Sequence, residues 1–275
     1  VPTLCALVLG CWLPGAGQAA ESRAPSAAPY VAIIIDDLGN HDGVGRRVAA
    51  LPGPVTCSIL PHTPHSARLA GECHRSGKEV GLDLPMDAVR ASERPGPGSL
   101  AQGQARAQVT RRVQHGFADV PFATGVNNHM GSHLTRHLAY MHWVMESLRE
   151  EGARFFVDSY TSPTSVALEV ARVNGLPAIR RDVFLDHRTD RAHIRRQLQV
   201  LRAVALREGA ALAIGHPHAT TLSELERALP ELAADGIMLV SVSALIHHQD
   251  QDLESWQASS YPSPTASRKS RPSPS

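Results

Sequence analysis

The sequence predicts one α/β domain built around a mostly parallel β-sheet. Hydrophobic residues make up 43% of the 275 residues and charged residues 19%, a balance typical of soluble proteins with a buried core. Short apolar runs alternate with segments of helical spacing about seven or eight times along the chain. No short repeat and no interdomain linker is visible between residues 28 and 248. Strands that alternate with helices form a parallel sheet, either closed as a barrel or open and doubly wound.

The expected strands follow one another through the whole of this region. The first, residues 30–35, is a continuous apolar run rich in β-branched residues, which is typical of a strand covered on both faces. Similar runs follow at residues 55–60, 79–84, 122–126, 154–157, 178–179, 210–214 and 237–240. Helical spacing is clearest at residues 138–150, 165–173, 194–207 and 222–232. The Pro- and Gly-rich residues 93–103 predict a long surface loop and a candidate lid.

The predicted domain covers residues 29–248. The two ends of the chain differ from it in composition. Residues 1–20 carry no charge and have an apolar core followed by small residues, so they resemble a signal peptide cleaved after Ala19 or Ala20. Lipidation at Cys11 is the alternative. This segment is too short to span a bilayer, and no integral membrane segment is expected in the mature chain. Residues 21–28 are a predicted linker, and residues 249–275, rich in Ser, Pro and Gln, a predicted disordered tail.

Composition also limits the possible partners. A net charge of +1 and an aromatic content of 4% give no reason to expect nucleic acid binding. No Gly-rich phosphate loop and no Gly-x-Ser-x-Gly nucleophile motif occurs. The only cysteines after residue 20 are Cys57 and Cys73, which could form one disulfide in an oxidising compartment, although their spacing alone does not establish it. The oligomeric state is left open.

Polar residues follow almost every predicted strand. Because the carboxyl ends of parallel strands lie on one side of the sheet, these side chains are expected to converge there. They are Asp36, Asp37, Asp83, Asn127, Asn128, His129, Asp158, Arg181, Asp182, His216 and His218. Asp, Asn and His without Cys favour a divalent metal with nitrogen and oxygen ligands, and such a metal supports hydrolysis of an amide or ester.

Several of these strand ends resemble the divergent polysaccharide deacetylases. The matching motifs are IIDDLG at 34–39, LPM at 84–86, NNHMGS at 127–132, FVDS at 156–159, RDVFLD at 181–186 and GHPH at 215–218. The resemblance covers roughly residues 30–245 in the expected order. It implies a distorted (β/α) barrel with mostly parallel strands, of the carbohydrate-esterase type, in an exported bacterial protein that is periplasmic or secreted. It also implies activity on N-acetylated sugars of a cell-wall polysaccharide, a peptidoglycan-type glycan.

The resemblance assigns roles to single residues. It makes Asp36 the general base and Asp37 a metal ligand, with His129 as the nitrogen ligand. His216, or less favourably His218, becomes the general acid. Asp83 stands where the family usually has histidine; we keep it as the third ligand of a metal, expected to be zinc, although a carboxylate there changes the metal preference. Substrate binding is assigned to Asn128, Asp158 and His218.

Some alternatives stay open at this point. His133 lies four residues after His129 and could replace the missing histidine ligand. Asp158 could instead cap a helix, while Arg181 and Asp182 could form a structural ion pair or orient the general base. Because of Asp83, the chain could be a non-catalytic carbohydrate-binding or envelope-interaction protein with a decayed site. A metal-free glycosidase that pairs Asp36 or Asp37 with Asp158 is a third hypothesis.

Overall fold

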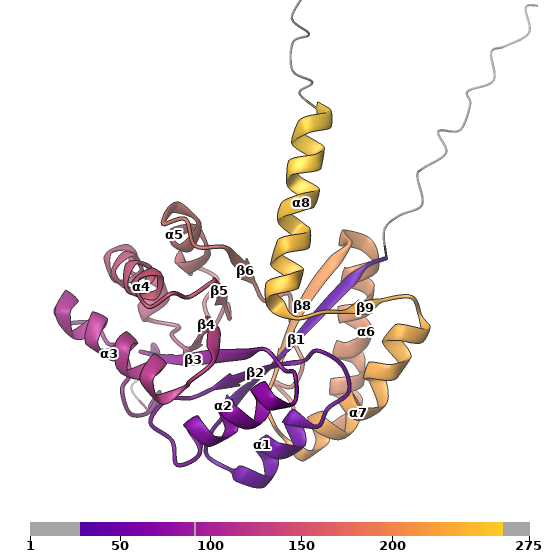
Figure 1. The fold of residues 1–275 in the computed structure, drawn as a ribbon, viewed down its shortest axis with the longest axis horizontal. Helices are drawn as coiled ribbons and strands as arrows, with labels where there is room; N and C mark the ends of the chain where they lie inside the picture. The colour runs from indigo at the N-terminus through magenta and orange to yellow at the C-terminus, as the bar shows by residue number, and fades with distance from the viewer. Residues whose placement is uncertain (1–27, 91, 261–275) are drawn as a thin grey trace, which may run out of the picture.

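A computed structural model describes residues 28–90 and 92–260, and a curled sheet of nine strands lies at its centre (Figure 1). The strands are β1 (Tyr30–Leu38), β2 (Thr56–Ile59), β3 (Val80–Met86), β4 (Ala123–Met130), β5 (Phe155–Asp158), β6 (Ala178–Arg180), β7 (Val183–Phe184), β8 (Ala210–Gly215) and β9 (Met238–Leu239). The helices are α1 (Asp42–Ala49), α2 (Ser66–Arg75), α3 (Arg106–Asp119), α4 (Leu138–Glu150), α5 (Ala167–Val173), α6 (Arg191–Glu208), α7 (Ala219–Ala234) and α8 (Val242–Ser260), with a 3₁₀ turn at Leu134–Arg136. The predicted signal peptide at residues 1–20 lies outside the described residues.

The sheet is a barrel that does not close. Its strands run in the order β6-β5-β4-β3-β2-β1-β8-β7, β9 pairs with the start of β1, and the strand pairings are parallel. β6 and β7 occupy the two edges, although only Arg181 and Asp182 separate them in the chain. This confirms the predicted distorted (β/α) barrel.

Strand alternation divides the core into two layers. In β1, Val31, Ile33 and Ile35 belong to the large cluster that α1 to α7 cover, whereas Ala32 and Ile34 face the barrel interior. Successive side chains of a strand point to opposite faces, so a strand buried on both needs a continuous apolar sequence. The same alternation points Asp36 into the interior at the carboxyl end of β1.

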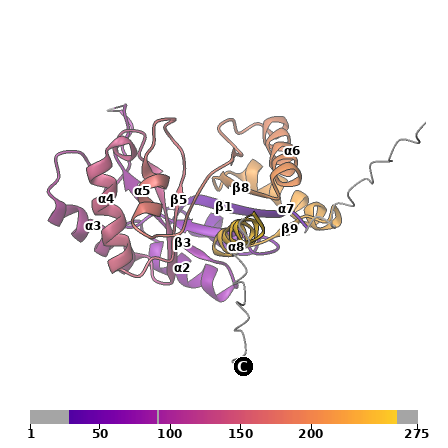
Figure 2. The same cartoon turned by 90° about the horizontal axis from the view of Figure 1, so that it is seen from above.

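Helix α8 covers the interior from the amino-terminal side of the strands. Its first turns contribute Val242, Leu245 and Ile246 to the cluster formed by the inward-facing apolar residues of β1, β5, β6 and β8. Figure 2 shows α8 end-on in front of the middle of the sheet, and Figure 1 shows that the helix extends away from the sheet after its first turns. Glu79 Oε2 accepts the backbone N–H groups of Val242 and Ser243 at 2.9 and 3.3 Å, which places a negative charge at the helix N-terminus, where it is stabilising.

The structure contains elements that the sequence analysis did not predict. Helices α1 and α2 were not predicted. They pack closely on each other through a glycine: a Cβ on Gly45 of α1 would lie 2.4 Å from a Leu69 methyl group of α2. Helix α8 continues through Ser260, so residues 249–260, predicted to be disordered, are helical; no Pro or Gly interrupts the sequence before Pro262. The remaining residues of the predicted tail, 261–275, are not among those described.

The predicted candidate lid is tied to the sheet. Within residues 93–103, Leu100 is fully buried, donates its N–H to Pro85 O at 2.8 Å and accepts the N–H of Asp87 at 2.9 Å. These bonds form a parallel bridge between Leu100 and Met86 at the end of β3. Over the described part of the chain, no helix has the length and apolar character needed to cross a membrane.

Candidate active site

The carboxyl ends of the strands bring most of the predicted residues together. Inward alternation places Asp36 on β1, Asp83 on β3 and His129 on β4, and His216 follows β8 on the same side. Asp37, directly after Asp36, has a φ of 58°, a left-handed conformation that aspartate tolerates better than most residues.

Asp37, Asp83 and His129 form a compact set of potential metal ligands, with one ligand atom from each lying within 4.8 Å of the others. His129 Nδ1 is 2.8 Å from Asp37 Oδ1 and 3.6 Å from Asp83 Oδ2. The backbone N–H of Asp37 donates to Asp83 Oδ2 at 3.2 Å. Asp83 is fully buried, and Asp37 Oδ1 is a buried oxygen without a hydrogen-bond donor of acceptable geometry in the described structure. Two carboxylates, one imidazole and an unsatisfied oxygen fit a divalent cation.

The titration of this set shows how strongly it attracts positive charge. Burial alone would lower the pKa of His129, but its contacts with Asp37 and Asp83 outweigh burial and raise the pKa to about 11. Burial also opposes ionisation of Asp37, yet His129 and His216 hold its pKa below the usual value. The pKa of Asp83 is raised, chiefly by burial. The imidazolium proton thus occupies the place between the carboxylates that a cation would take.

Asp36 lies deeper than Asp37, with 5% of its surface exposed. Its Oδ1 accepts a hydrogen bond from Asn127 Nδ2 at 3.2 Å. Burial, followed by repulsion from Asp83, raises the pKa of Asp36 well above its ordinary value, against the attraction of His216 and His129. A carboxyl group with a raised pKa is a better proton acceptor near neutral pH.

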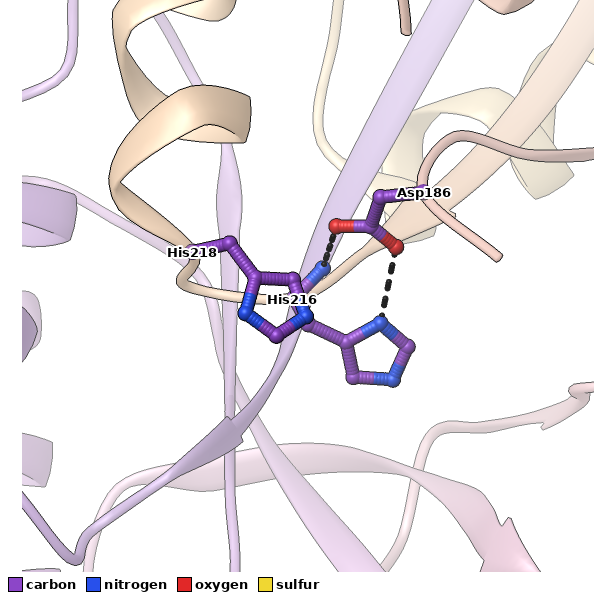
Figure 3. Close-up of side chains that lie close together, drawn as sticks. All are labelled: Asp186, His216 and His218. Atoms are coloured by element: carbon purple, nitrogen blue, oxygen red, sulfur yellow. Dashed lines mark hydrogen bonds and ion pairs between the residues drawn. The ribbon is translucent and has the colours of Figure 1, made fainter. Parts of the chain in front are cut away.

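His216 is oriented by Asp186. Its Nδ1 lies 2.9 Å from Asp186 Oδ1, and its backbone N–H donates to Asp186 Oδ2 at 2.7 Å (Figure 3). Thr221 Oγ1 donates to the same Oδ2 at 2.8 Å. This arrangement leaves Nε2 of His216 free to face the ligand set, 3.8 Å from Asp37 Oδ2. Burial would lower the pKa of His216, but the Asp186 hydrogen bond and the charges of Asp36 and Asp186 raise it to about 9.

Asp186, His216 and His218 form a second group of potential metal ligands, with one ligand atom from each within 4.8 Å of the others. Both oxygens of Asp186 already accept hydrogen bonds, from Thr221 and from two groups of His216. The exposed His218 ring lies 6.0 Å from the His216 ring and turns to the side of it (Figure 3). The Asp37 set, which has an unsatisfied oxygen, is the better match to a cation.

Two hollows flank the site. One of about 560 Å³ is lined by Asp37, His41, His216 and His218 among others. The second, of about 680 Å³, lies beyond His129 and includes Met130, Ser132, Arg90, Thr161 and Pro163. Both are lined by residues that follow the strands, Asp37 in the first and Met130, next to His129, in the second, so both could hold parts of a substrate.

Comparison with known proteins decides the family. The family model described as divergent polysaccharide deacetylase matches residues 33–246. The chain belongs to the divergent polysaccharide deacetylase family. Escherichia coli strain K12 has a relative, the uncharacterized protein YibQ, that is 35% identical over 229 residues, 83% of this chain and 70% of YibQ. An uncharacterized protein of Haemophilus influenzae is 34% identical over 219 residues, 80% of this chain and 77% of its own.

Solved structures agree with this assignment. The uncharacterized protein ATU2773 from Agrobacterium tumefaciens C58 superposes with a TM-score of 0.76 and 25% identity, over 82% of this chain and 92% of ATU2773. A mutant CE4 family pseudoenzyme with restored enzymatic activity shares the fold, with a TM-score of 0.51 and 14% identity over 80% of this chain and 68% of its own. These similarities show that the fold described above also occurs in other solved proteins.

In this member of the divergent polysaccharide deacetylase family, Asn128 and Asp158 do not face the site, contrary to the predicted role in substrate binding. Asn128 is 1% exposed, accepts the N–H of Ser159 at 2.9 Å and donates to Met130 O at 2.7 Å. Asp158 is fully buried and accepts the N–H of Tyr160 at 2.9 Å. Both side chains hold the loop after β5 in shape. The burial of Asp158 also removes one of the carboxyl groups that the glycosidase hypothesis needs.

Contacts bear on two further alternatives. His133 Nε2 lies 2.7 Å from Gln102 Oε1, and His133 is not in the set with Asp37, Asp83 and His129. Arg181 Nε donates to Ser159 O at 2.8 Å, and Asp182 Oδ2 accepts the N–H of Leu212 at 2.8 Å, so neither hydrogen bond is the ion pair that the sequence suggested. The charge of Asp36 acts on Arg181, and a role for Arg181 in orienting the general base stays a prediction.

The sequence analysis placed Asn127, the centre of the polar network, among the strand-end residues but assigned it no role. Its Nδ2 donates to Asp83 Oδ1 at 2.8 Å and to Asp36 Oδ1 at 3.2 Å, while its Oδ1 accepts the hydroxyl of Ser58. A signal was present, because residues two apart in a strand share a face, so choosing His129 as a ligand selects Asn127 rather than Asn128. Asp186, in the RDVFLD motif, was given no role, because the short strand β7 that precedes it was not predicted.

Proposed function

We propose that the chain is an exported, metal-dependent hydrolase that removes acetyl groups from N-acetylated sugars of a cell-envelope polysaccharide, a peptidoglycan-type glycan. The observation that carries this proposal is the set Asp37, Asp83 and His129 next to a buried carboxyl group, Asp36, and an oriented imidazole, His216. A proton acceptor and a proton donor beside a cation site are what hydrolysis of an amide requires.

The proposed metal is zinc, held by Asp37, Asp83 and His129. When bound, a divalent metal lowers the pKa of water and polarises the amide carbonyl group. Asp36 accepts the proton of the attacking water, since burial has raised the pKa of its carboxyl group. His216 Nε2 donates a proton to the departing amine, and Asp186 keeps that nitrogen directed at the site. Asn127 holds Asp36 and Asp83 in position.

Metal content tests the ligand set directly. We expect close to one divalent ion per chain after EDTA treatment and reloading, and strong loss of that ion in Asp37→Ala, because the loss of Asp37 removes one of the three ligands. Asp190→Ala, at the exposed N-cap of α6, is the matched control and should keep the metal. If Asp37→Ala binds as much metal as the wild type, or if no variant binds metal, the ligand set is rejected.

Acetate release tests the reaction. N-acetylglucosamine oligosaccharides and peptidoglycan fragments should lose acetate in the presence of the metal-loaded protein, and EDTA should stop the release. Asp36→Asn should keep its metal while activity falls by about 100-fold or more, the usual contribution of a general base. Activity that survives EDTA treatment would reject the metal-dependent mechanism.

The second candidate is a non-catalytic glycan-binding protein with the same cleft. It is favoured by Asp83, which together with Asp36 and Asp37 surrounds one imidazole with three carboxyl groups. Retention of the glycan without acetate release, in a protein that holds metal, would move this candidate ahead of the enzyme.

A further inference from the structure

The described part of the chain contains two cysteines, Cys57 in β2 and Cys73 in α2, and they lie in the same core cluster. Both are fully buried. Alternation in β2 directs Cys57 to the outer, helix-covered face, whereas its neighbour Ser58 faces the interior and Asn127. The pair is therefore separate from the candidate active site, although Cys57 is adjacent in sequence to a residue of the polar network.

Backbone hydrogen bonds bring the two residues close together. The N–H of Cys57 donates to Glu79 O at 2.8 Å, and Cys73 O accepts the N–H of Lys78, the residue before Glu79, at 2.9 Å. The nearby Cys73 side chain, together with burial, raises the pKa of Cys57. Helix α2 runs back over β2 after a short turn, which brings together two residues that are separated by the 15 residues 58–72. A disulfide needs this kind of closeness, because the bond forms only where the two Cβ atoms approach each other.

A buried ammonium group lies beside the pair. Lys78 is 7% exposed, and its Nζ donates to the backbone carbonyls of Leu51 and Gly53. The backbone N–H of Lys78 donates to Cys73 O at 2.9 Å, which fixes the end of α2. The charge of Lys78 opposes the rise in the pKa of Cys57 without outweighing it, so the folded protein keeps the Cys57 thiol protonated.

We propose that Cys57 and Cys73 form an intramolecular disulfide that joins α2 to β2 when the chain folds under oxidising conditions. The oxidant is a small-molecule disulfide such as oxidised glutathione. One cysteine thiolate attacks it and releases one glutathione thiolate, and the second cysteine then displaces the other glutathione from the mixed disulfide. One S–S bond forms in the protein, one breaks in the oxidant, and the two electrons and two protons lost by the cysteines appear in two molecules of glutathione.

Burial determines when this exchange takes place. Because neither sulfur reaches the surface, glutathione meets the thiols before α2 has packed on β2 or during local opening. Refolding in a glutathione buffer should therefore oxidise the pair much faster than incubation of the folded, reduced protein does. The bond would also restrain β2, which carries Ser58 and its hydrogen bond to Asn127.

Peptide mapping of the full-length protein tests the proposal. The protein is reduced, unfolded in urea, refolded with reduced and oxidised glutathione, alkylated and digested with trypsin. Cleavage after Arg47, Arg68 and Arg75 places Cys57 in the peptide 48–68 and Cys73 in the peptide 69–75, whereas Cys5 and Cys11 fall in the peptide 1–23. We expect peptides 48–68 and 69–75 to be joined, and to separate after reduction.

A second measurement makes the result independent of variants that fail to fold. The midpoint of thermal unfolding of the oxidised wild type should lie above that of the reduced wild type by about 5–10 °C, because the cross-link restricts the unfolded chain. Cys57→Ser and Cys73→Ser should show no linked peptide and no effect of reductant. Recovery of peptides 48–68 and 69–75 separately alkylated after refolding in excess oxidised glutathione would overturn the proposal.

Discussion

Replacement of Asn127 by alanine tests whether one buried amide holds the candidate site together. Asn127 Nδ2 donates to Asp83 at 2.8 Å and to Asp36 at 3.2 Å, and all three side chains are almost completely buried. A hydrogen bond to a charged group contributes about 1.5–3 kcal/mol, and the longer of these two bonds is expected near the lower end. Asn127→Ala should therefore lower the free energy of unfolding of the metal-free protein by about 3–4 kcal/mol.

The assay is urea unfolding of EDTA-treated protein at neutral pH, followed by circular dichroism. Ser58→Ala is the matched control, because it removes a neutral hydroxyl donor to the same amide and should lower the free energy of unfolding by only about 1 kcal/mol. Metal affinity should also fall in Asn127→Ala, by about 10–100-fold, since the amide orients the ligand Asp83. A change below about 1 kcal/mol in Asn127→Ala, or an equal change in both variants, would refute the argument that the charged hydrogen bonds hold the site.

Two further predictions concern packing and pH. Gly125→Ala places a Cβ about 2.1 Å from the Phe155 ring inside the barrel, so it should lower the free energy of unfolding by about 1–3 kcal/mol, measured by urea unfolding. Gly81→Ala, whose Cβ meets its nearest neighbour at 3.5 Å, is the control, and equal values for the two variants would contradict the packing argument. The pKa of His216, raised to about 9 by Asp186 and neighbouring carboxylates, implies a stabilisation of about 3 kcal/mol that is complete below about pH 6.5 and lost as the pH rises towards 9. Unfolding of the metal-free protein between pH 6 and 9.5 should show this loss in the wild type and a smaller decline in Asp186→Asn, where only His129, with its pKa raised to about 11, still loses stabilisation over this range; parallel profiles would contradict the prediction.

Much of the fold was predictable because the barrel is built from local patterns. The apolar run that became β1 and the helical spacing that became α4 both depend on side-chain period within one element. Short elements were harder to predict. The two residues of β7 carry no period of their own, and they form a strand because β8 is already in place to pair with them.

The site was partly predictable for a topological reason. Parallel strands send their carboxyl ends to one side, and this rule was enough to place Asp37, Asp83 and His129 among the polar residues at one end of the sheet. Their selection as metal ligands came from the resemblance to the family. The same rule does not say which way each side chain points, and that is why Asn128 and Asp158 were assigned to substrate although both point into the protein.

The sequence by itself determined that this chain forms a parallel α/β sheet with carboxylates and imidazoles at its strand ends, because strand alternation and helical period are written in neighbouring residues; the barrel was implied by the resemblance of its motifs to a known family. Only the tertiary structure decided that Asn127 joins Asp36 to Asp83, that Asp186 orients His216, and that α8 covers the barrel interior. Each of these contacts joins segments dozens of residues apart. Their geometry depends on the curl of the whole sheet, which no single segment of the chain specifies.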